Sequence, residues 1–206
     1  MIVRGEIFNS ATHLAGSVFA VGGLAALVST SVRSGDPRRV ASFAVFGVSM
    51  VALYLFSTLY HGLSGPAKRI FRKLDHTSIY VLIAGTYTPF ALVSLRRAGG
   101  TGLLAVVWSL AAAGIAQEFL LPKRIRALSV SLYLLMGWLA AAFFFPLLRA
   151  IGPRGMAGLA AGGILYSAGV FFYLVDEKYA HSHGVFHLFV LGGSVLHFIV
   201  VLFFVT

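Results

Sequence analysis

Seven long runs of apolar residues follow one another along the chain, each bounded by charged residues, glycine or proline. They cover residues 14–32, 40–60, 78–95, 102–121, 127–148, 156–175 and 185–205. Each run has 18 to 22 residues, and a helix needs about 20 residues to cross the ~30 Å hydrocarbon layer of a membrane. A lipid-facing β-barrel would instead show alternating segments of about ten residues. The pattern predicts an all-α integral membrane protein built as a seven-transmembrane helix bundle.

The connections between these runs are short, which places neighbouring helices antiparallel. Lys and Arg number nine in the N-terminal segment and the second, fourth and sixth loops, against seven in the other loops. Because cytoplasmic loops are enriched in Lys and Arg, this difference favours a cytoplasmic N-terminus, and seven crossings then place the C-terminus outside. We expect a multi-pass protein of the plasma membrane, with residues 1–206 forming one transmembrane domain and no separate soluble domain.

The composition agrees with a chain that lies mostly in lipid. Hydrophobic residues make up 59% and charged residues 11% of the 206, with a mean hydropathy of +0.91, whereas a soluble domain carries about 25% charged residues. The net charge of +10 sits beside the apolar runs, where it meets lipid headgroups, and no long basic face exists to bind a nucleic acid. The chain has no cysteine, so a metal would need His, Asp, Glu or water as ligands.

Small residues recur within the apolar runs, and the chain contains 23 glycines. Gly158 and Gly162 are four residues apart in the sixth run, a spacing with which small residues let two membrane helices pack closely. We therefore expect a helix contact at this pair.

Six of the seven histidines are predicted to lie at one face of the membrane, at the ends of the first, second, third and seventh runs. In chain order they are His13, His61, His76, His181, His183 and His187. Asp75 and Glu118 are expected at the same face. His197 follows His187 by about 15 Å along the seventh helix, so it lies deeper in the membrane.

Three of these histidines have the pattern of a metal site. His183 and His187 are four residues apart, so on a helix their rings lie on one side, one turn apart. His61 reaches the same face from the second helix. Three imidazoles with water in the fourth position are the arrangement of catalytic zinc sites. The sequence therefore predicts Zn²⁺ bound by His61, His183 and His187.

Two further residues are candidates for catalysis beside this metal. The segment between the paired histidines, Gly184 to Phe186, has no acidic residue and is interpreted as a spacer, so a general base must come from another helix. Asp75 can hydrogen-bond the water of the site and act as general base or acid. Ser57, one turn before His61, can orient the water or a substrate carbonyl.

The remaining histidines have simpler interpretations. His13, His76 and His181 are interpreted as polar groups that face the lipid headgroups. His197 is interpreted as a hydrogen-bonding group between two helices, because a polar side chain deep in a membrane usually faces another helix.

Several motifs together resemble the haemolysin III group of the progestin and adipoQ receptor (PAQR) family, over essentially the whole chain. The matching pieces are Glu6-Ile7-Phe8-Asn9-Ser10-x-Thr12-His13, Ser57-x-x-x-His61, Lys73-Leu74-Asp75-His76, Gly85-Thr86-Tyr87-Thr88-Pro89, and His183-Gly184-Val185-Phe186-His187 continuing to His197-Phe198. The resemblance implies a seven-helix membrane protein with its N-terminus in the cytoplasm and Zn²⁺ near the cytoplasmic face. It also implies zinc on His61, His183 and His187, a water-holding carboxylate at Asp75 and a supporting hydroxyl at Ser57.

Three functions are compatible with these features. The first is a zinc-dependent hydrolase of lipid amide bonds, because the wider superfamily of the resemblance includes alkaline ceramidases; its substrate would come from the membrane lipids. The second is a membrane receptor or signalling module with a structural zinc, whose closed site Asp75 would complete as fourth ligand. The third is a lytic or pore-forming protein, as the name of the haemolysin III group suggests.

Overall fold

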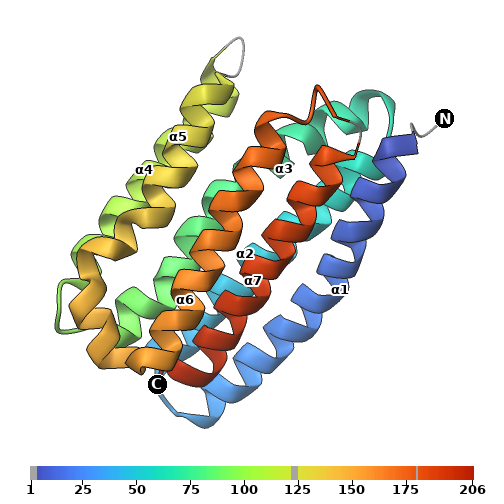
Figure 1. Cartoon of the computed structure of the whole chain (residues 1–206). Coiled ribbons are helices and arrows are strands. Elements are labelled where there is room, and N and C mark those ends of the chain that lie inside the picture. Colours follow the sequence, from blue (N-terminus) through green and yellow to red (C-terminus); the bar gives the residue numbers. More distant parts are fainter. Residues whose placement is uncertain (1–3, 122–124, 180) are drawn as a thin grey trace.

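The chain folds into a bundle of long helices, shown in Figure 1. This structure is a computed structural model, and it describes residues 4–121, 125–179 and 181–206. Its helices are α1 (Arg4–Arg33), α2 (Pro37–Gly62), α3 (Gly65–Pro89), α4 (Gly100–Leu120), α5 (Arg126–Trp138), α6 (Phe144–Leu174) and α7 (Ser182–Phe204). A π-helical turn, Phe90–Ser94, follows α3, and a 3-10 segment, Leu139–Phe143, joins α5 to α6.

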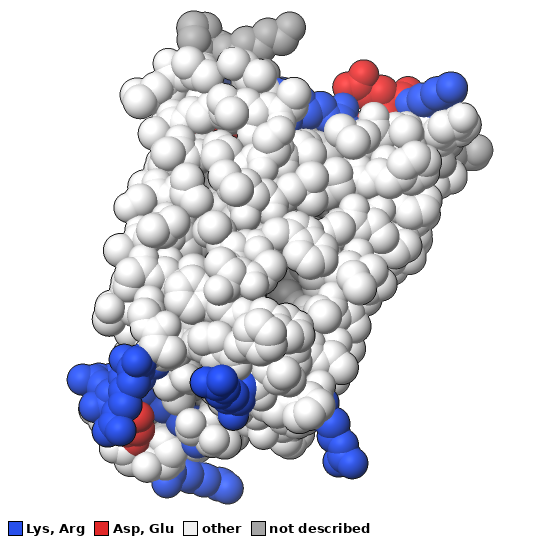
Figure 2. Space-filling view, turned by 60° about the vertical axis from the view of Figure 1, so that its left-hand side comes forward, with Lys and Arg blue, Asp and Glu red and all other residues white. Residues whose placement is uncertain are grey.

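Six helical stretches of the described chain are long and apolar enough to cross a membrane. They are Glu6–Arg33, Pro37–Gly62, Gly65–Ser94, Gly100–Leu120, Arg126–Leu174 and Ser182–Phe204. The face in Figure 2 carries its Lys and Arg at two opposite ends and a broad uncharged band between them. Apolar helices with charges confined to their ends identify an integral, multi-pass membrane protein.

The stretch Arg126–Leu174 does not run straight through the bundle. Its 49 residues would measure about 74 Å as one helix, more than twice the ~30 Å hydrocarbon thickness. The helix is interrupted by the 3-10 segment and again at Gly152, whose φ of 70° and ψ of 173° are not helical. In Figure 1 α5 and α6 run in opposite directions. The run expected at residues 127–148 is therefore not one continuous α-helix, which corrects the sequence prediction.

The chain segments that contain most of the histidines lie at one end of the bundle. The end of α2 and the start of α3 are joined by a connection of two residues, and α1 and α7 begin at the same end. At the other end of the bundle, Asp36 caps the start of α2. Its carboxylate accepts a hydrogen bond from the backbone N–H of Arg38 at 2.9 Å. The predicted placement of these segments at a single end is confirmed.

The glycine pair in α6 makes the expected close contact with α7. A Cβ atom on Gly158 would lie 2.7 Å from a methyl group of Val200, closer than real carbon contacts. A Cβ atom on Gly162 would collide with the His197 ring. Both glycines therefore allow α7 to approach α6 more closely than any larger residue would.

Candidate metal centre

His61, His183 and His187 come together at the N-terminal end of the bundle. Each offers one ligand nitrogen, and these three atoms all lie within 4.8 Å of one another. His61 stands at the end of α2, and the other two lie in the first turns of α7, so the helical spacing and the antiparallel topology together bring the rings into contact. The ring centroids of His183 and His187 are 4.7 Å apart. The group can hold a metal ion, as the sequence predicts.

Each histidine of the cluster directs its Nδ1 atom at an oxygen atom of another segment. The partners are Glu6 Oε2 at 2.5 Å from His61, Asp176 Oδ2 at 2.7 Å from His183, and the Asn9 carbonyl at 3.2 Å from His187. Because all three oxygens are acceptors, Nδ1 carries the proton in each ring and Nε2 is left with its lone pair. In proteins, a histidine that binds a metal through one ring nitrogen usually donates a hydrogen bond from the other ring nitrogen to such an oxygen.

The two carboxylates are themselves held by cations from other helices. Glu6 also accepts a hydrogen bond from Lys68 Nζ at 3.1 Å, and Asp176 accepts one from Arg126 Nη2 at 2.7 Å. Burial raises the pKa of the Asp176 carboxyl, but hydrogen bonds from His183 and Arg126 outweigh that effect and hold the pKa below its usual value. Sequence reasoning missed both acids. The sequence offered one indication of their importance: the chain has only six Asp and Glu residues in all. An acidic residue at the end of a membrane helix needs a partner for its charge.

Buried polar atoms without partners show that the cluster fits a ligand. Ser57 is 1% exposed, and its Oγ has no hydrogen-bond partner among the described residues. His61 Nε2, on the same face of α2, is equally buried and equally unpartnered in the described chain. Leaving such groups unpaired costs about 1–3 kcal/mol each. A bound metal at His61 and a polar molecule at Ser57 would satisfy both atoms.

Asp75 lies on the neighbouring helix, α3. Its side chain is buried and stands within electrostatic range of His61 and Tyr60. The metal-binding group itself contains the three histidines and none of the carboxylates that the structure describes. Asp75 is thus placed beside the cluster, and its role as proton carrier stays a prediction.

His13 belongs to this region as well, which corrects its interpretation as a headgroup-facing residue. It is 3% exposed, and its ring stacks on His187 with centroids 3.6 Å apart. The rings of His13 and Tyr54 are nearly perpendicular, with centroids 5.1 Å apart. Both ring nitrogens are buried without a partner among the residues described. His13 therefore packs against the metal site from α1.

The other three histidines lie apart from the cluster. His76 pairs with Glu118 at 3.5 Å, and His181 starts α7 with a left-handed φ of 67°. His197 Nε2 lies 3.1 Å from the Leu159 carbonyl on α6. The predicted hydrogen bond between helices at His197 is confirmed.

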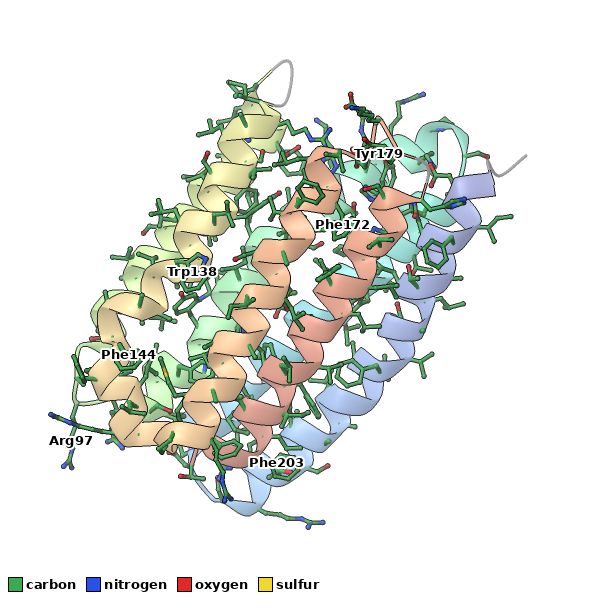
Figure 3. The ribbon with its side chains drawn as sticks, in the orientation of Figure 1. Arg97, Trp138, Phe144, Phe172, Tyr179 and Phe203 are labelled. Atoms are coloured by element: carbon green, nitrogen blue, oxygen red, sulfur yellow. The ribbon has the colours of Figure 1, made fainter. Side chains whose placement is uncertain are left out.

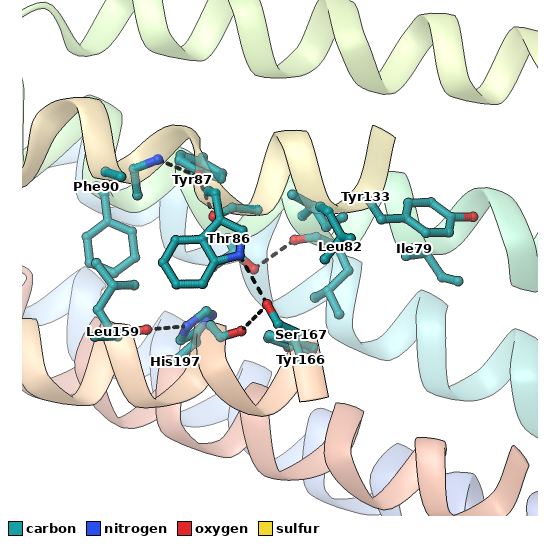
Figure 4. Close-up of a pocket in the computed structure, with 18 of the residues that line it drawn as sticks. Ile79, Leu82, Thr86, Tyr87, Phe90, Tyr133, Leu159, Tyr166, Ser167 and His197 are labelled. Carbon is teal, nitrogen blue, oxygen red and sulfur yellow. Dashed lines mark hydrogen bonds between the residues drawn. The ribbon is translucent and has the colours of Figure 1, made fainter. Parts of the chain in front are cut away.

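An apolar cavity of about 300 Å³ lies inside the bundle. Its walls come mainly from α3, α5, α6 and α7, with few polar groups, among them Thr86, Ser167 and His197 (Figure 4). Tyr173 and Phe186 line this cavity, and their rings lie 6.0 and 5.8 Å from the His183 ring. The cavity thus lies beside the histidine cluster: its lining includes these two neighbours of His183 but not the three clustered histidines themselves.

Comparisons with known proteins give consistent matches. A sequence model of a family described as "Haemolysin-III related" matches residues 1–198. The chain is 44% identical to "Hemolysin-3" of Bacillus cereus, over 98% of this chain and 93% of that protein. It is 43% identical to "Hemolysin-3 homolog" of Bacillus subtilis (strain 168), over 98% and 95%. It is also 28% identical to human "Monocyte to macrophage differentiation factor", over 75% of this chain and 66% of that protein.

Proposed function

The chain belongs to the haemolysin-III-related family, as its motifs predict, and we propose that it is a zinc-dependent hydrolase of lipid amide bonds. The observation that supports the proposal is that two features of the structure lie side by side. Three histidines each offer a ring nitrogen within 4.8 Å of the others, and an apolar cavity of about 300 Å³ lies beside them, lined near His183 by Tyr173 and Phe186. A polar reaction centre beside an apolar cavity fits a substrate with a polar linkage and a long chain.

The donor set favours zinc over other common metals. Neutral imidazole nitrogens suit zinc, whereas calcium and magnesium prefer oxygen ligands. Three protein ligands leave one position open, which is the arrangement of catalytic sites, and a structural site would be closed by a fourth ligand. Zinc held this way supplies a Lewis acid that lowers the pKa of water to about 7.

The chain's own residues would orient the substrate and move the proton. Ser57 Oγ, buried and unpartnered among described atoms, would hydrogen-bond the substrate carbonyl or the attacking water. Asp75 would take the proton of that water and pass it to the leaving amine. The cavity would hold the acyl chain and keep bulk water from the site.

The membrane arrangement that goes with this function has seven crossings. Residues 126–151 and 153–174, on either side of Gly152, would measure about 39 and 33 Å as helices, each enough for a ~30 Å layer. We place the N-terminus and the metal centre on the cytoplasmic side of the plasma membrane and the C-terminus outside. The excess of Lys and Arg at the N-terminal face supports this orientation.

The test measures zinc content and amide hydrolysis on the same purified protein. Wild type should bind one zinc per chain and cleave a fluorescent ceramide. His187→Ala should lose the metal, and Asp75→Asn should keep it but lose at least ~100-fold in kcat, within the range for a general base. His181→Asn is the matched control, because asparagine tolerates the left-handed backbone there. Wild type without zinc, or full turnover by Asp75→Asn across a panel of lipid amides, would refute the proposal.

A second candidate function is lysis of membranes, supported by the names of the two relatives at 43% and 44% identity, "Hemolysin-3 homolog" and "Hemolysin-3". A lytic protein needs no metal-dependent chemistry. Liposomes loaded with dye would leak when the protein is added, and the leakage would survive His183→Ala. Leakage that is absent from the wild type removes this candidate.

A further inference from the structure

Asp176 connects the metal centre to a part of the bundle that contributes no ligand. It lies in the segment between α6 and α7, and each of its two carboxylate oxygens accepts a hydrogen bond. Oδ2 is 2.7 Å from His183 Nδ1, and Oδ1 is 2.7 Å from Arg126 Nη2. One carboxylate therefore holds a metal-binding histidine and an arginine of α5 at once.

Arg126 is the first residue of α5, and it binds the end of α6 in several ways. Beyond Asp176, its guanidinium donates to Glu177 Oε1 at 2.9 Å and to the Tyr173 carbonyl. It also lies over the Tyr173 ring, 4.2 Å from the centroid. A planar guanidinium in a fixed fork suits this combination of contacts better than a lysine. The start of α5 is thus fastened to the end of α6 through one side chain.

The helices that Arg126 joins form facing walls of the apolar cavity. Val130, Tyr133 and Trp138 line it from α5, and Tyr166, Ser167 and Tyr173 line it from α6. Farther along, Trp138 lies between the two helices (Figure 3), where its Nε1 donates to Ser167 Oγ at 3.1 Å. A change in the distance between α5 and α6 would therefore move two walls of the cavity relative to each other.

We infer that Asp176 and Arg126 couple the metal centre to α5, so that metal binding and closure of α5 against α6 favour each other. A metal held by His183 would polarise the ring and strengthen the hydrogen bond from Nδ1–H to Asp176. That bond fixes the carboxylate in the orientation that Arg126 requires. Coupling of two equilibria is reciprocal, so losing Arg126 must weaken metal binding although Arg126 contacts no ligand.

Asp176 and its neighbour Glu177 provide a matched pair of variants. Both carboxylates pair with Arg126, but only Asp176 reaches His183. In Asp176→Asn one of the two carboxylate oxygens becomes an NH2 donor, which then faces the N–H of either His183 or Arg126 instead of accepting from it. Glu177→Gln weakens the ion pair between Glu177 and Arg126. The Glu177 side chain is 87% exposed and does not contact the histidine cluster.

The inference rests on the proposed metal site but not on hydrolysis, so its test uses binding and distance alone. The chain lacks cysteine, so Leu128→Cys in α5 and Leu174→Cys in α6 give one specific pair of spin labels. Both leucines are exposed, at 43% and 53%. Pulsed electron paramagnetic resonance then measures the label distance in the full-length protein, with zinc and with a chelator.

In the labelled wild type, zinc should shorten and narrow the distance distribution. Asp176→Asn should stay broad with and without zinc and bind zinc about 10-fold more weakly or worse. Arg126→Gln should also stay broad and bind zinc several-fold more weakly, whereas Glu177→Gln should match wild type. Zinc affinity in Arg126→Gln equal to wild type, or narrowing by zinc in Asp176→Asn, would overturn the coupling.

The outcomes separate this inference from the proposed hydrolase. If wild type binds zinc and its distance distribution does not change, the coupling is wrong and the metal site stands. If the distance responds to zinc but no lipid amide is cleaved, the hydrolase is wrong and the coupling stands. A wild type that binds no zinc overturns both.

Discussion

At the scale of single residues, the meeting of the three histidines was predictable and the partners of their rings were not. His183 and His187 follow from helical spacing, and His61 from the antiparallel order of the helices. Glu6 and Asp176 contact His61 and His183 across 55 and 7 positions of sequence, and no periodicity connects such pairs. Their placement depends on how α1 and the α6–α7 segment pack, which the hydrophobic pattern does not specify.

Glu6→Gln tests the support of His61. The substitution keeps the size of the side chain but removes the negative charge that His61 and Lys68 share. We expect zinc affinity to fall about 10-fold, the usual effect of losing an outer partner of a metal-binding histidine. Titration against a chelator of known affinity measures it. Lys68→Gln should have a smaller effect, because Lys68 does not contact the ring, and equal losses in both variants would contradict this account.

At the scale of helices, the first turns of α7 depend on a close contact with α1. The interpretation of Gly184 as a spacer between two histidines is incomplete. A Cβ atom there would collide with the Phe8 ring and lie 2.9 Å from Asn9 Oδ1. Helical periodicity shows which face of α7 turns inward, but the separation of two helices depends on the side chains between them. Gly184 therefore also allows the approach that places the Asn9 carbonyl beside His187.

Gly184→Ala should weaken both metal binding and the fold without removing a ligand. Pushing α1 away costs about 1–3 kcal/mol, typical of overpacking, and lengthens the hydrogen bond from His187 to Asn9. Thermal unfolding in detergent, with and without zinc, measures both effects. Gly192→Ala on the same helix is the control, since its Cβ would meet only a flexible methyl of Leu165 at 3.2 Å. Unchanged unfolding and zinc affinity in Gly184→Ala would show that α1 adjusts freely.

Two adjacent glycines of α6 test the contact between α6 and α7. Gly162→Ala should lower the unfolding temperature, because the new methyl group would displace the His197 ring and its hydrogen bond to Leu159. We expect a loss of about 1–3 kcal/mol. Gly163→Ala should be neutral, since no atom of the described residues lies within 4 Å of its Cβ position. Similar losses in the two variants would indicate a general intolerance of alanine in α6.

At the scale of the whole molecule, hydrophobic runs predicted the bundle and the end at which the histidines meet. The expected runs 127–148 and 156–175 leave a connection that contains Gly152, where the helix is interrupted, but they carry no signal for the 3-10 segment Leu139–Phe143. The cavity could not be predicted at all. Its walls come from α3, α5, α6 and α7, and their separation depends on a few long-range contacts such as Arg126 with Asp176.

The number of crossings is decided by the side of the membrane on which the segment after α6 lies. Two crossings within Arg126–Leu174 place Glu177 on the side of Arg69, whereas a single crossing would place it on the side of Arg97. Because the chain has no cysteine, a single cysteine can replace each of these exposed residues and, in turn, Arg154. An impermeant maleimide on sealed vesicles should label Glu177→Cys from the same side as Arg69→Cys. It should label Arg154→Cys from the same side as Arg97→Cys. Labelling of Glu177→Cys from the side of Arg97→Cys would mean six crossings, and would leave the fold without the α5–α6 hairpin that forms the cavity.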